Sequence, residues 1–379
     1  MTYCKLSHSG LYVGTTGSVR QCCIQKSTDS TVITNWADID SLSKMYIDDK
    51  WLSKVRSDLD NGIQNSACSK CWRAEHSKLL SKRQRVNSNA QYSDQTDITT
   101  VDLRLSNKCN LQCKMCYPGA SDQIAKLALE LKENGVHTDL LNTMGESIYN
   151  VDHLLTMVTD LPNLKYLRLA GGEPFIMPEV EEMLFKLVEM GKTDITIDFI
   201  TNCTSAKSKI IEVLEKFKSV QLQCSIDAIG DDLEYQRYPA SWEKIETNFK
   251  KFYNSKCEVN LTPCITLLNL VNLHEFIHWT EQFPKSKVEF NEVDDMTFLD
   301  FRLVPLSARS DLTEFLAGYS MKNNLKPNWH LFAKRMVHEV REPNDIEIEK
   351  LTHYALDIWD YKCRIKFLHK YPYMDFMIK

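Results

Sequence analysis

Several features that would place this chain in a familiar class are missing from its 379 residues. No apolar run reaches the roughly 18 residues of a transmembrane helix, so no membrane span is expected. The first residues, MTYCKLSHSG, have no cationic segment followed by an apolar core and are not typical of a secretory signal. The net charge of −5 gives no basic excess, which argues against a nucleic-acid partner.

Two common catalytic signatures are missing as well, namely a glycine-rich phosphate loop and a Ser–His–Asp order. The sequence assigns no catalytic acid or base. Cysteine, by contrast, is frequent, with 13 residues, several of them grouped. Grouped cysteines in a chain without a secretory signal favour metal or redox chemistry over disulfides, and they indicate a reducing cytoplasm. The basic stretch around Lys78, Lys82, Arg83 and Arg85 is expected to be a solvated helix or linker.

The densest cysteine group lies in Ser106–Pro118, which reads SNKCNLQCKMCYP. Cys109, Cys113 and Cys116 have the spacing C-x3-C-x2-C. Thiolates are the usual ligands of iron–sulfur clusters, and three of them on a [4Fe–4S] cube leave one iron open to a small molecule. A structural zinc site is the alternative, but zinc normally takes four nitrogen or sulfur ligands and no fourth one is close by.

This loop resembles the signature of the radical S-adenosylmethionine (radical SAM) enzymes. The resemblance implies that the open iron binds the amino and carboxylate groups of SAM. It further implies that an electron from the cluster cleaves SAM and releases a 5′-deoxyadenosyl radical, while the protein supplies placement and shielding. An electron donor such as flavodoxin or ferredoxin would then be a partner.

Six strand-like segments alternate with helix-like segments between residues 96 and 310. We expect strands at Thr100–Leu105, Leu164–Ala170, Asp194–Thr201, Ser219–Ile226, Glu258–Ile265 and Lys287–Val293. We expect helices at Ser121–Asn134, Met144–Thr159, Pro178–Met190, Ser205–Phe217, Ser241–Tyr253 and Asn272–Gln282. This alternation predicts an α/β fold with a parallel sheet, and six repeats match the partial (β/α)6 TIM barrel of the radical SAM family.

The expected strands alternate between apolar and polar residues more regularly than fully covered parallel strands do. One face must pack on the outer helices, so the polar face is expected to line the lumen. Burying many unpaired polar groups would be too costly. We therefore expect a charged network of Asp102, Arg104, Arg168 and Asp198 beneath the substrate, with a purely structural network as the alternative.

The remaining motifs follow the ends of the expected strands, where barrels of this kind place their chemistry. The second strand is followed by the GGEP motif of the radical SAM family, which implies contact with the SAM amino group through Gly171, Gly172, Glu173 and Pro174. A simple glycine turn is the alternative. By the same resemblance, further SAM contacts are expected from Asn202, Ser225, Asp227 and Arg237. Arg237 lies in the segment Tyr235-Gln-Arg237-Tyr, which resembles the Y-x-x-R segment of the family, and it could hold the SAM carboxylate because a guanidinium matches that group.

Residues 1–95 contain a second cysteine set, made of Cys4, Cys22, Cys68 and Cys71. A hairpin turning at Thr15–Gly17 would bring the first two together, and a helix over Ile39–Asp60 could return the other two. Four thiolates suit a structural zinc ion as well as an iron–sulfur cluster. Cys23 could replace Cys22 as a ligand.

The order C-x12-G-x4-C…C-x2-C resembles the auxiliary-cluster modules known as twitch and SPASM domains. Those modules usually follow the barrel, whereas this set precedes it. The resemblance implies an auxiliary [4Fe–4S] cluster, and zinc remains the alternative.

The sequence therefore predicts a cysteine-rich auxiliary region at 1–95, a radical SAM barrel at 96–310 and a helical extension at 311–379. Helices are expected in this extension at Asp311–Met321, Trp329–Glu339 and Ile346–His369. The predicted function is reductive SAM cleavage followed by modification of a peptide or protein, because auxiliary clusters in relatives often accompany such substrates. The alternatives are a small-metabolite substrate and, in another class, a zinc-stapled binding protein without catalysis.

Overall fold

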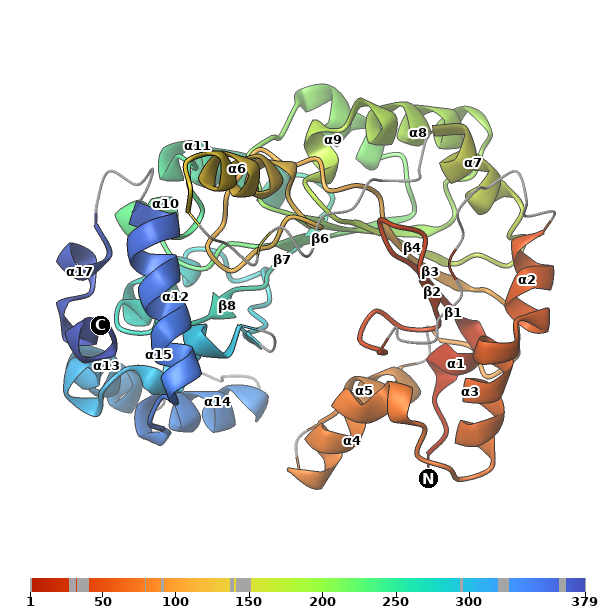
Figure 1. Ribbon diagram of the computed structural model, residues 1–379. Coiled ribbons are helices and arrows are strands. Elements are labelled where there is room, and N and C mark those ends of the chain that lie inside the picture. The colour runs from red at the N-terminus through yellow and green to blue at the C-terminus, as the bar shows by residue number, and fades with distance from the viewer. Residues whose placement is uncertain are drawn as a thin grey trace.

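The computed structural model describes residues 2–26, 32, 41–78, 80–89, 92–136, 140, 151–293, 296–319, 327–360 and 366–378. Its main sheet has seven strands in the order β2-β1-β3-β4-β5-β6-β7, and β8 pairs with β9. The strands are β1 (Gly10–Val13), β2 (Val19–Arg20), β3 (Thr100–Arg104), β4 (Tyr166–Ala170), β5 (Thr196–Thr201), β6 (Ser219–Cys224), β7 (Glu258–Leu261), β8 (Cys264–Ile265) and β9 (Asn291–Glu292). The sheet curves into an open arch with helices on its outer side (Figure 1), which confirms the predicted α/β partial barrel.

The first four expected barrel strands coincide with β3 to β6, but the fifth is divided into β7 and β8. Pro263 lies at the division. Proline has no N–H to donate to a strand ladder, which explains the interruption there. The sixth expected strand is reduced to β9 and a single bridge between Leu261 and Val288.

The predicted N-terminal hairpin is confirmed, since β1 and β2 pair antiparallel around a turn in which Gly17 has φ +83°. Its place in the fold was not predicted. β1 pairs in parallel with β3, so that Leu11 lies opposite Val101 and Tyr12 lies opposite Asp102. The N-terminal segment thus extends the barrel sheet by one parallel strand.

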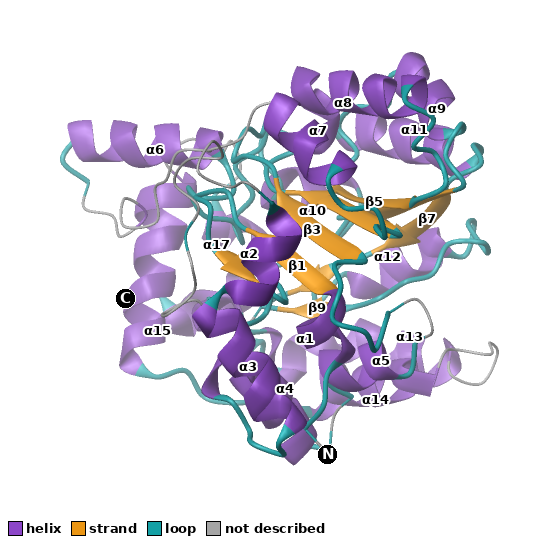
Figure 2. Cartoon of the chain, turned by 90° about the vertical axis from the view of Figure 1, so that its right-hand side faces the viewer, coloured by secondary structure: helices purple, strands orange, loops and turns teal. Residues whose placement is uncertain are grey.

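The outer helices of the barrel bury their apolar faces against the sheet. They are α6 (Asp122–Glu133), α7 (Val151–Thr159), α8 (Pro178–Glu189), α9 (Ser208–Leu214), α10 (Gly230–Gln236), α11 (Trp242–Tyr253) and α12 (Leu273–Thr280). All six expected helices are present, and α10 is an additional helix that was not predicted. Residues 144–150, expected at the start of the second helix, lie outside the described part. Seen from the side (Figure 2), α7, α8, α9 and α11 cover one face of the sheet.

The N-terminal region adds short helices beyond the opposite face (Figure 2). They are α1 (Lys5–Ser9), α2 (Leu42–Asp48), α3 (Lys50–Asp60), η2 (Ser66–Cys68), α4 (Ser69–His76) and α5 (Lys82–Asn87). The helix expected over Ile39–Asp60 is divided at Asp49, whose side chain accepts from Leu52 N at 2.8 Å and caps α3. Aspartate favours such caps because its side chain satisfies a free N–H of the first turn.

The expected solvated basic stretch is helical in part, as α5, but it is not all solvated. Lys78 and Arg85 are exposed, whereas Lys82 is half-buried and Arg83 is buried. Arg83 is held by Glu75 at 2.6 Å and lies over the Trp72 ring. This pairing explains why a charged residue lies inside, because a buried charge needs a partner.

The C-terminal extension contains η5 (Thr297–Leu299), η6 (Phe301–Leu303), η7 (Leu306–Arg309), α13 (Ser310–Tyr319), α14 (Pro327–His338), α15 (Asp345–Thr352), η8 (His353–Trp359), α17 (Phe367–Lys370) and η9 (Pro372–Met377). The single helix expected over Ile346–His369 is wrong, because α15 changes to the π-helix η8 at His353. None of the described helices combines the length and apolar character that crossing a membrane requires.

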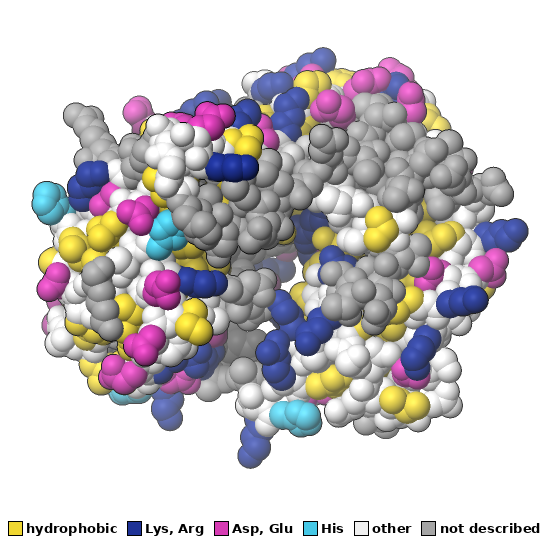
Figure 3. Space-filling view, viewed as in Figure 1, with side chains coloured by type: hydrophobic (Ala, Val, Ile, Leu, Met, Phe, Trp, Pro, Cys, Tyr) yellow, Lys and Arg dark blue, Asp and Glu magenta, His cyan; other side chains and the backbone are white. Residues whose placement is uncertain are grey.

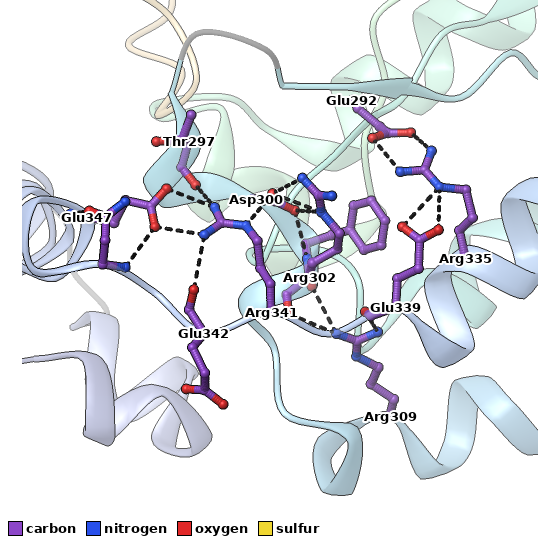
Figure 4. Close-up of polar contacts among 12 residues, drawn as sticks. Glu292, Thr297, Asp300, Arg302, Arg309, Arg335, Glu339, Arg341, Glu342 and Glu347 are labelled. Atoms are coloured by element: carbon purple, nitrogen blue, oxygen red, sulfur yellow. Dashed lines mark hydrogen bonds and ion pairs between the residues drawn. The ribbon is translucent and has the colours of Figure 1, made fainter. Parts of the chain in front are cut away.

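A network of arginines and carboxylates ties this extension to the end of the barrel (Figure 4). Arg335 joins Glu292 on β9, and Arg341 joins Asp300 at 2.9 Å. Arg309 is fully buried and donates to five backbone carbonyl oxygens, those of Phe301, Arg302, Val304, Met336 and Glu339. These bonds compensate the desolvation of its charge and fix the turns η6 and η7 against α14.

Candidate active site at the carboxyl ends of the strands

The three cysteines of the C-x3-C-x2-C loop lie directly after β3. Cys109 and Cys113 are buried, and Cys116 is half-buried beside them. They form a small apolar cluster together with Leu111 and neighbouring side chains. The structure therefore brings the three predicted ligands together on one loop.

Backbone contacts hold this loop against the segment that follows α10. Gln112 N donates to Tyr238 O at 2.6 Å, and Lys114 N donates to Gln236 O at 2.9 Å. On the other side, Cys109 N donates to the Asp122 carboxylate in the first turn of α6 at 2.8 Å. The cysteine loop is thus held from two sides, by the end of α10 with the segment after it and by α6.

Two side chains direct N–H donors at the sulfurs. Asn202 Nδ2 lies 3.9 Å from Cys109 Sγ, and Arg237 Nη1 lies 3.7 Å from Cys113 Sγ. Burial raises the pKa of the Cys116 thiol to about 11 and also raises the pKa of Cys109 and Cys113. Buried thiols of this kind favour the thiolate once a metal and N–H donors share its charge.

The GGEP loop after β4 packs closely on the cysteine loop. Gly172 has φ +53°, and a Cβ added there would lie 2.2 Å from Lys108 O. Gly171 has φ +86°, and a Cβ added there would lie 3.0 Å from Ser106 O. Glu173 N donates to Lys108 O at 2.9 Å. Glycine is required here by both the conformation and the contact.

The Glu173 carboxylate is fully buried and accepts from three groups at the GGEP loop and the end of β5. These donors are Phe175 N at 3.1 Å, Thr201 Oγ1 at 2.8 Å and Asn202 N at 2.6 Å. Burial raises the pKa of Glu173 to about 7. The Glu173 carboxylate therefore holds the backbone of Asn202 in place. The contact between the GGEP motif and SAM stays a prediction.

Arg237 and Asp227 form a buried ion pair at 2.7 Å. Asp227 also accepts from Cys264 N at 2.8 Å, which links the end of β6 to β8. Ser225 is half-buried beside this pair, and its N–H donates to Thr201 O at 2.8 Å. The structure thus gathers the predicted SAM contacts of β5, β6 and the following segment around the cysteine loop.

Sequence reasoning missed two polar residues of this site. Asn110 lies within the cysteine loop, accepts from Asn202 Nδ2 at 3.2 Å and donates to Thr204 Oγ1 at 3.0 Å. Thr204 in turn donates to Asn202 Oδ1 at 2.6 Å. Asn110 could have been found as a short polar side chain between two expected ligands, whereas Thr204 gave no signal.

The donor set fits a [4Fe–4S] cluster with SAM. Three thiols share one loop, two of their sulfurs receive N–H donors, and Gly172 permits a backbone approach that a Cβ would block. No three Cys, His, Asp or Glu side chains among the described residues are placed to hold a single metal ion.

The second cysteine set lines one cavity, to which Cys4, Cys22, Cys68 and Cys71 all contribute. Gln25 Nε2 lies 3.7 Å from Cys68 Sγ. Burial raises the pKa of Cys4 to about 11 and of Cys68 to about 12. The four predicted ligands therefore line one cavity, and thiols suit either an iron–sulfur cluster or zinc, although no three of them are close enough together in this structure to hold a single metal ion.

Cys23 faces the barrel side of this region. It hydrogen-bonds with Cys22, and this contact, with Lys82 nearby, lowers the pKa of Cys23. Lys82 Nζ lies 2.9 Å from Cys23 Sγ.

The charged network expected in the lumen is present. Asp102, Arg168 and Asp198 lie opposite one another on β3, β4 and β5. Arg168 and the Tyr166 hydroxyl both bond to the fully buried Asp198, and Arg104 pairs with Asp102 at 3.4 Å. Its role beneath a substrate remains a prediction.

Comparison with known proteins agrees with this site. The family model of the Radical SAM superfamily matches residues 103–282, which contain the cysteine loop, the GGEP motif and the following strand ends. Residues 103–282 are thus similar to the radical SAM superfamily of enzymes, the family that the cysteine loop resembles.

Individual relatives are distant. A "Probable GTP 3',8-cyclase" of Archaeoglobus fulgidus is 22% identical over 213 residues, which cover 51% of this chain and 58% of the relative. The solved structure "Native anSMEcpe with bound AdoMet" is 15% identical, with coverage of 59% and 60% of the two chains and a TM-score of 0.43. SuiB of Streptococcus suis bound to S-adenosylmethionine is 13% identical, with coverage of 75% and 61% and a TM-score of 0.43. The chain spans about three fifths of the length of each.

Proposed function

We propose that this protein reductively cleaves SAM at a [4Fe–4S] cluster and uses the resulting radical to modify a peptide or protein. The observation that carries the proposal is the arrangement of three thiols at the carboxyl ends of the parallel strands, with Asn202 and Arg237 donating to two of their sulfurs. The match of residues 103–282 to the superfamily supports it.

In this proposal, Cys109, Cys113 and Cys116 would hold the cluster, which would supply an electron for reductive cleavage of SAM. Asn202 and Arg237 stabilise the thiolates through N–H···S contacts. The loop of Gly171 to Pro174 offers its backbone close to the cysteine loop. Three further side chains are proposed to orient SAM, namely Ser225, Asp227 and Arg237.

We assign the auxiliary region to residues 1–95, the radical SAM barrel to residues 96–310 and the helical extension to residues 311–379. Cys4, Cys22, Cys68 and Cys71 hold a second [4Fe–4S] cluster in this proposal. Their common cavity supports one shared site, and zinc is the competing occupant.

The substrate is a peptide or protein in the favoured version. The space-filling view (Figure 3) shows a hollow near the middle of the molecule, with Lys and Arg side chains along its edge. An open lumen of this kind admits a segment of a larger chain. A small metabolite is the second candidate, and the similarity to a probable GTP cyclase favours it. A flavodoxin or ferredoxin would supply the electrons in a reducing cytoplasm.

Anaerobic purification followed by iron analysis and a SAM-cleavage assay tests the proposal. We expect a brown protein with about seven to eight irons when both sites are filled, and release of 5′-deoxyadenosine on reduction. A colourless zinc protein that never forms 5′-deoxyadenosine would refute it.

The two sites can be separated by substitution. Replacing Cys68 and Cys71 by Ala should remove about half of the iron and leave SAM cleavage at the first cluster. Replacing Cys113 by Ala should do the opposite, with the auxiliary metal retained and cleavage lost. If the Cys68/Cys71 change removed all iron, the division into two sites would be wrong.

A further inference from the structure

Lys114 is a buried lysine inside the cysteine loop. It lies between two of the predicted ligands, directly after Cys113 and two residues before Cys116. It is 4% exposed, whereas Lys108 of the same loop is exposed. Lysine is almost never fully buried unless its charge is paired. Its ammonium group is therefore expected to have partners inside the protein.

Two aromatic rings from distant parts of the chain lie against this ammonium group. Lys114 Nζ is 4.1 Å from the ring centroid of Tyr235, on α10, and 5.3 Å from that of Trp359, in η8. A cation within about 6 Å of an aromatic face is attracted by the charge distribution of the ring, most strongly where water is excluded. Both rings are buried, so the contact is desolvated.

A carboxylate of the C-terminal extension also acts on this lysine. Asp360 follows Trp359 and is buried. Burial raises the pKa of Asp360, while a hydrogen bond from Phe367 N and the charges of Lys366 and Lys114 oppose this rise. The Lys114 ammonium and the Asp360 carboxylate therefore interact, which favours the charged form of the lysine inside the protein.

The extension is itself attached to the barrel beside these rings. The Tyr371 ring packs edge-on against Tyr235 at 5.6 Å, and its hydroxyl donates to Leu268 O at 2.9 Å. Lys370 forms an ion pair with Asp232 in the first turn of α10. The cysteine loop is thus joined to a part of the extension that has its own contacts with the barrel.

A buried cation next to a cluster ligand affects the redox equilibrium of that cluster. Reduction adds one electron, and a nearby positive charge stabilises the reduced form. At a separation of about 10 Å and an effective dielectric constant of about 20, one unit charge changes an equilibrium constant by about tenfold or more. Lys114 follows Cys113 directly, so its ammonium lies one side-chain length from the backbone beside a ligand.

We infer that Lys114 is a positioning residue of the first site. Its contact with Trp359 fixes the cysteine loop on the C-terminal extension and holds a positive charge beside the cluster, which raises the reduction potential. The inference rests on the proposed function, because it assumes a [4Fe–4S] cluster in the cysteine loop. It gives the extension a part in the redox properties of the barrel site.

The reduction potential of the first cluster tests the role of the charge. A redox titration of the full-length, anaerobically loaded protein would be followed by electron paramagnetic resonance, and addition of SAM identifies the signal of the first cluster. Lys114→Met keeps the apolar stem and should lower the potential by about 59 mV, a tenfold change for one electron. Lys114→Arg keeps a cation over the rings and should restore most of the parent value.

Lys108→Met is the matched control for this titration. It removes a lysine of the same charge from the same loop, but the Lys108 side chain is exposed. Water and salt screen exposed charges, so its removal should leave the potential unchanged. The Lys108 backbone oxygen, which lies against the GGEP loop, is not altered by the substitution.

Unfolding of the metal-free protein tests the contact with Trp359 without any cluster. A double-mutant cycle compares the unfolding equilibrium constants of Lys114→Met, Trp359→Leu and the double variant in urea. We expect the two substitutions to be coupled by about tenfold, the effect of one desolvated cation–π contact. The same cycle with Lys108→Met in place of Lys114→Met should show no coupling.

Two results would overturn the inference. One is a potential that is unchanged in Lys114→Met or shifts equally in Lys108→Met, and the other is additive effects of Lys114→Met and Trp359→Leu. If Lys114→Met does not retain the first cluster, Lys114→Arg and the cycle decide the question. A parent protein that binds no iron and forms no 5′-deoxyadenosine would instead refute the proposed function, and the cycle would still measure the contact.

Discussion

Gly172→Ala should disrupt the cysteine site while sparing the rest of the fold. The added Cβ would lie 2.2 Å from Lys108 O. Cβ atoms do not approach a carbonyl oxygen closer than about 3.0 Å, so the GGEP and cysteine loops must separate by nearly 1 Å. The residue would also keep φ +53°, which costs an L-amino acid about 1–2 kcal/mol.

The effect of the close contact can be separated from the conformational cost. Gly191→Ala is the matched control, because Gly191 has φ +72° and no atom within 4 Å of its added Cβ. Both variants should lose about 1–2 kcal/mol of unfolding free energy from the backbone. Only Gly172→Ala should also displace the thiols, and a misplacement of about 1 Å typically costs about a hundredfold in rate.

The assay compares iron per chain, the spectrum of the reduced cluster and the rate of 5′-deoxyadenosine release in the two variants. We expect Gly191→Ala to resemble the parent protein in all three. We expect Gly172→Ala to lose iron from the first site or to cleave SAM about a hundredfold more slowly. Equal iron content and equal rates in both variants would show that the contact with Lys108 does not position the cysteine loop.

Three further predictions concern buried charges, and urea unfolding of the metal-free protein measures each. Arg237→Met leaves Asp227 buried without its ion pair and should cost about 3–5 kcal/mol; a loss below about 1 kcal/mol would contradict it. Arg309→Met should cost at least about 3 kcal/mol because five carbonyls lose their donor, whereas Arg302→Met, a partly exposed control, should cost about 1 kcal/mol or less. The pKa of Glu173 is raised from 4.5 to about 7, so the folded state binds the proton more tightly, and stability should fall by up to about 3 kcal/mol as pH rises from about 4.5 to 7. Glu173→Gln should flatten this pH dependence, and an unchanged profile would show that Glu173 is not its source.

The three cysteines predicted as ligands of the first site could be found from the sequence because they are local. Three cysteines within one short loop must lie near one another in any fold, and the period of apolar residues revealed the strands on either side. The GGEP motif was equally local, since two glycines before a carboxylate indicate a close backbone approach. Pairing of these elements into a parallel sheet followed from their alternation.

The contacts between distant segments could not be derived in this way. The N–H donors of Asn202 and Arg237 reach Cys109 and Cys113 only because β5 and the segment after α10 end beside the cysteine loop. The division of the expected helix at Asp49 arises because the Asp49 side chain caps α3 instead of continuing α2. The local sequence permits either a continuous helix or a division there.

The sequence by itself determined the class of chemistry, because thiol spacing and strand alternation are properties of neighbouring residues. The tertiary structure decided that β1 lies beside β3 and that four cysteines share one cavity. It also decided that Arg83 is buried and Lys82 half-buried, although Lys78 and Arg85 of the same basic stretch are exposed. Each of these arrangements depends on the free energy of packing segments that are far apart in the chain. A local sequence pattern does not report this free energy.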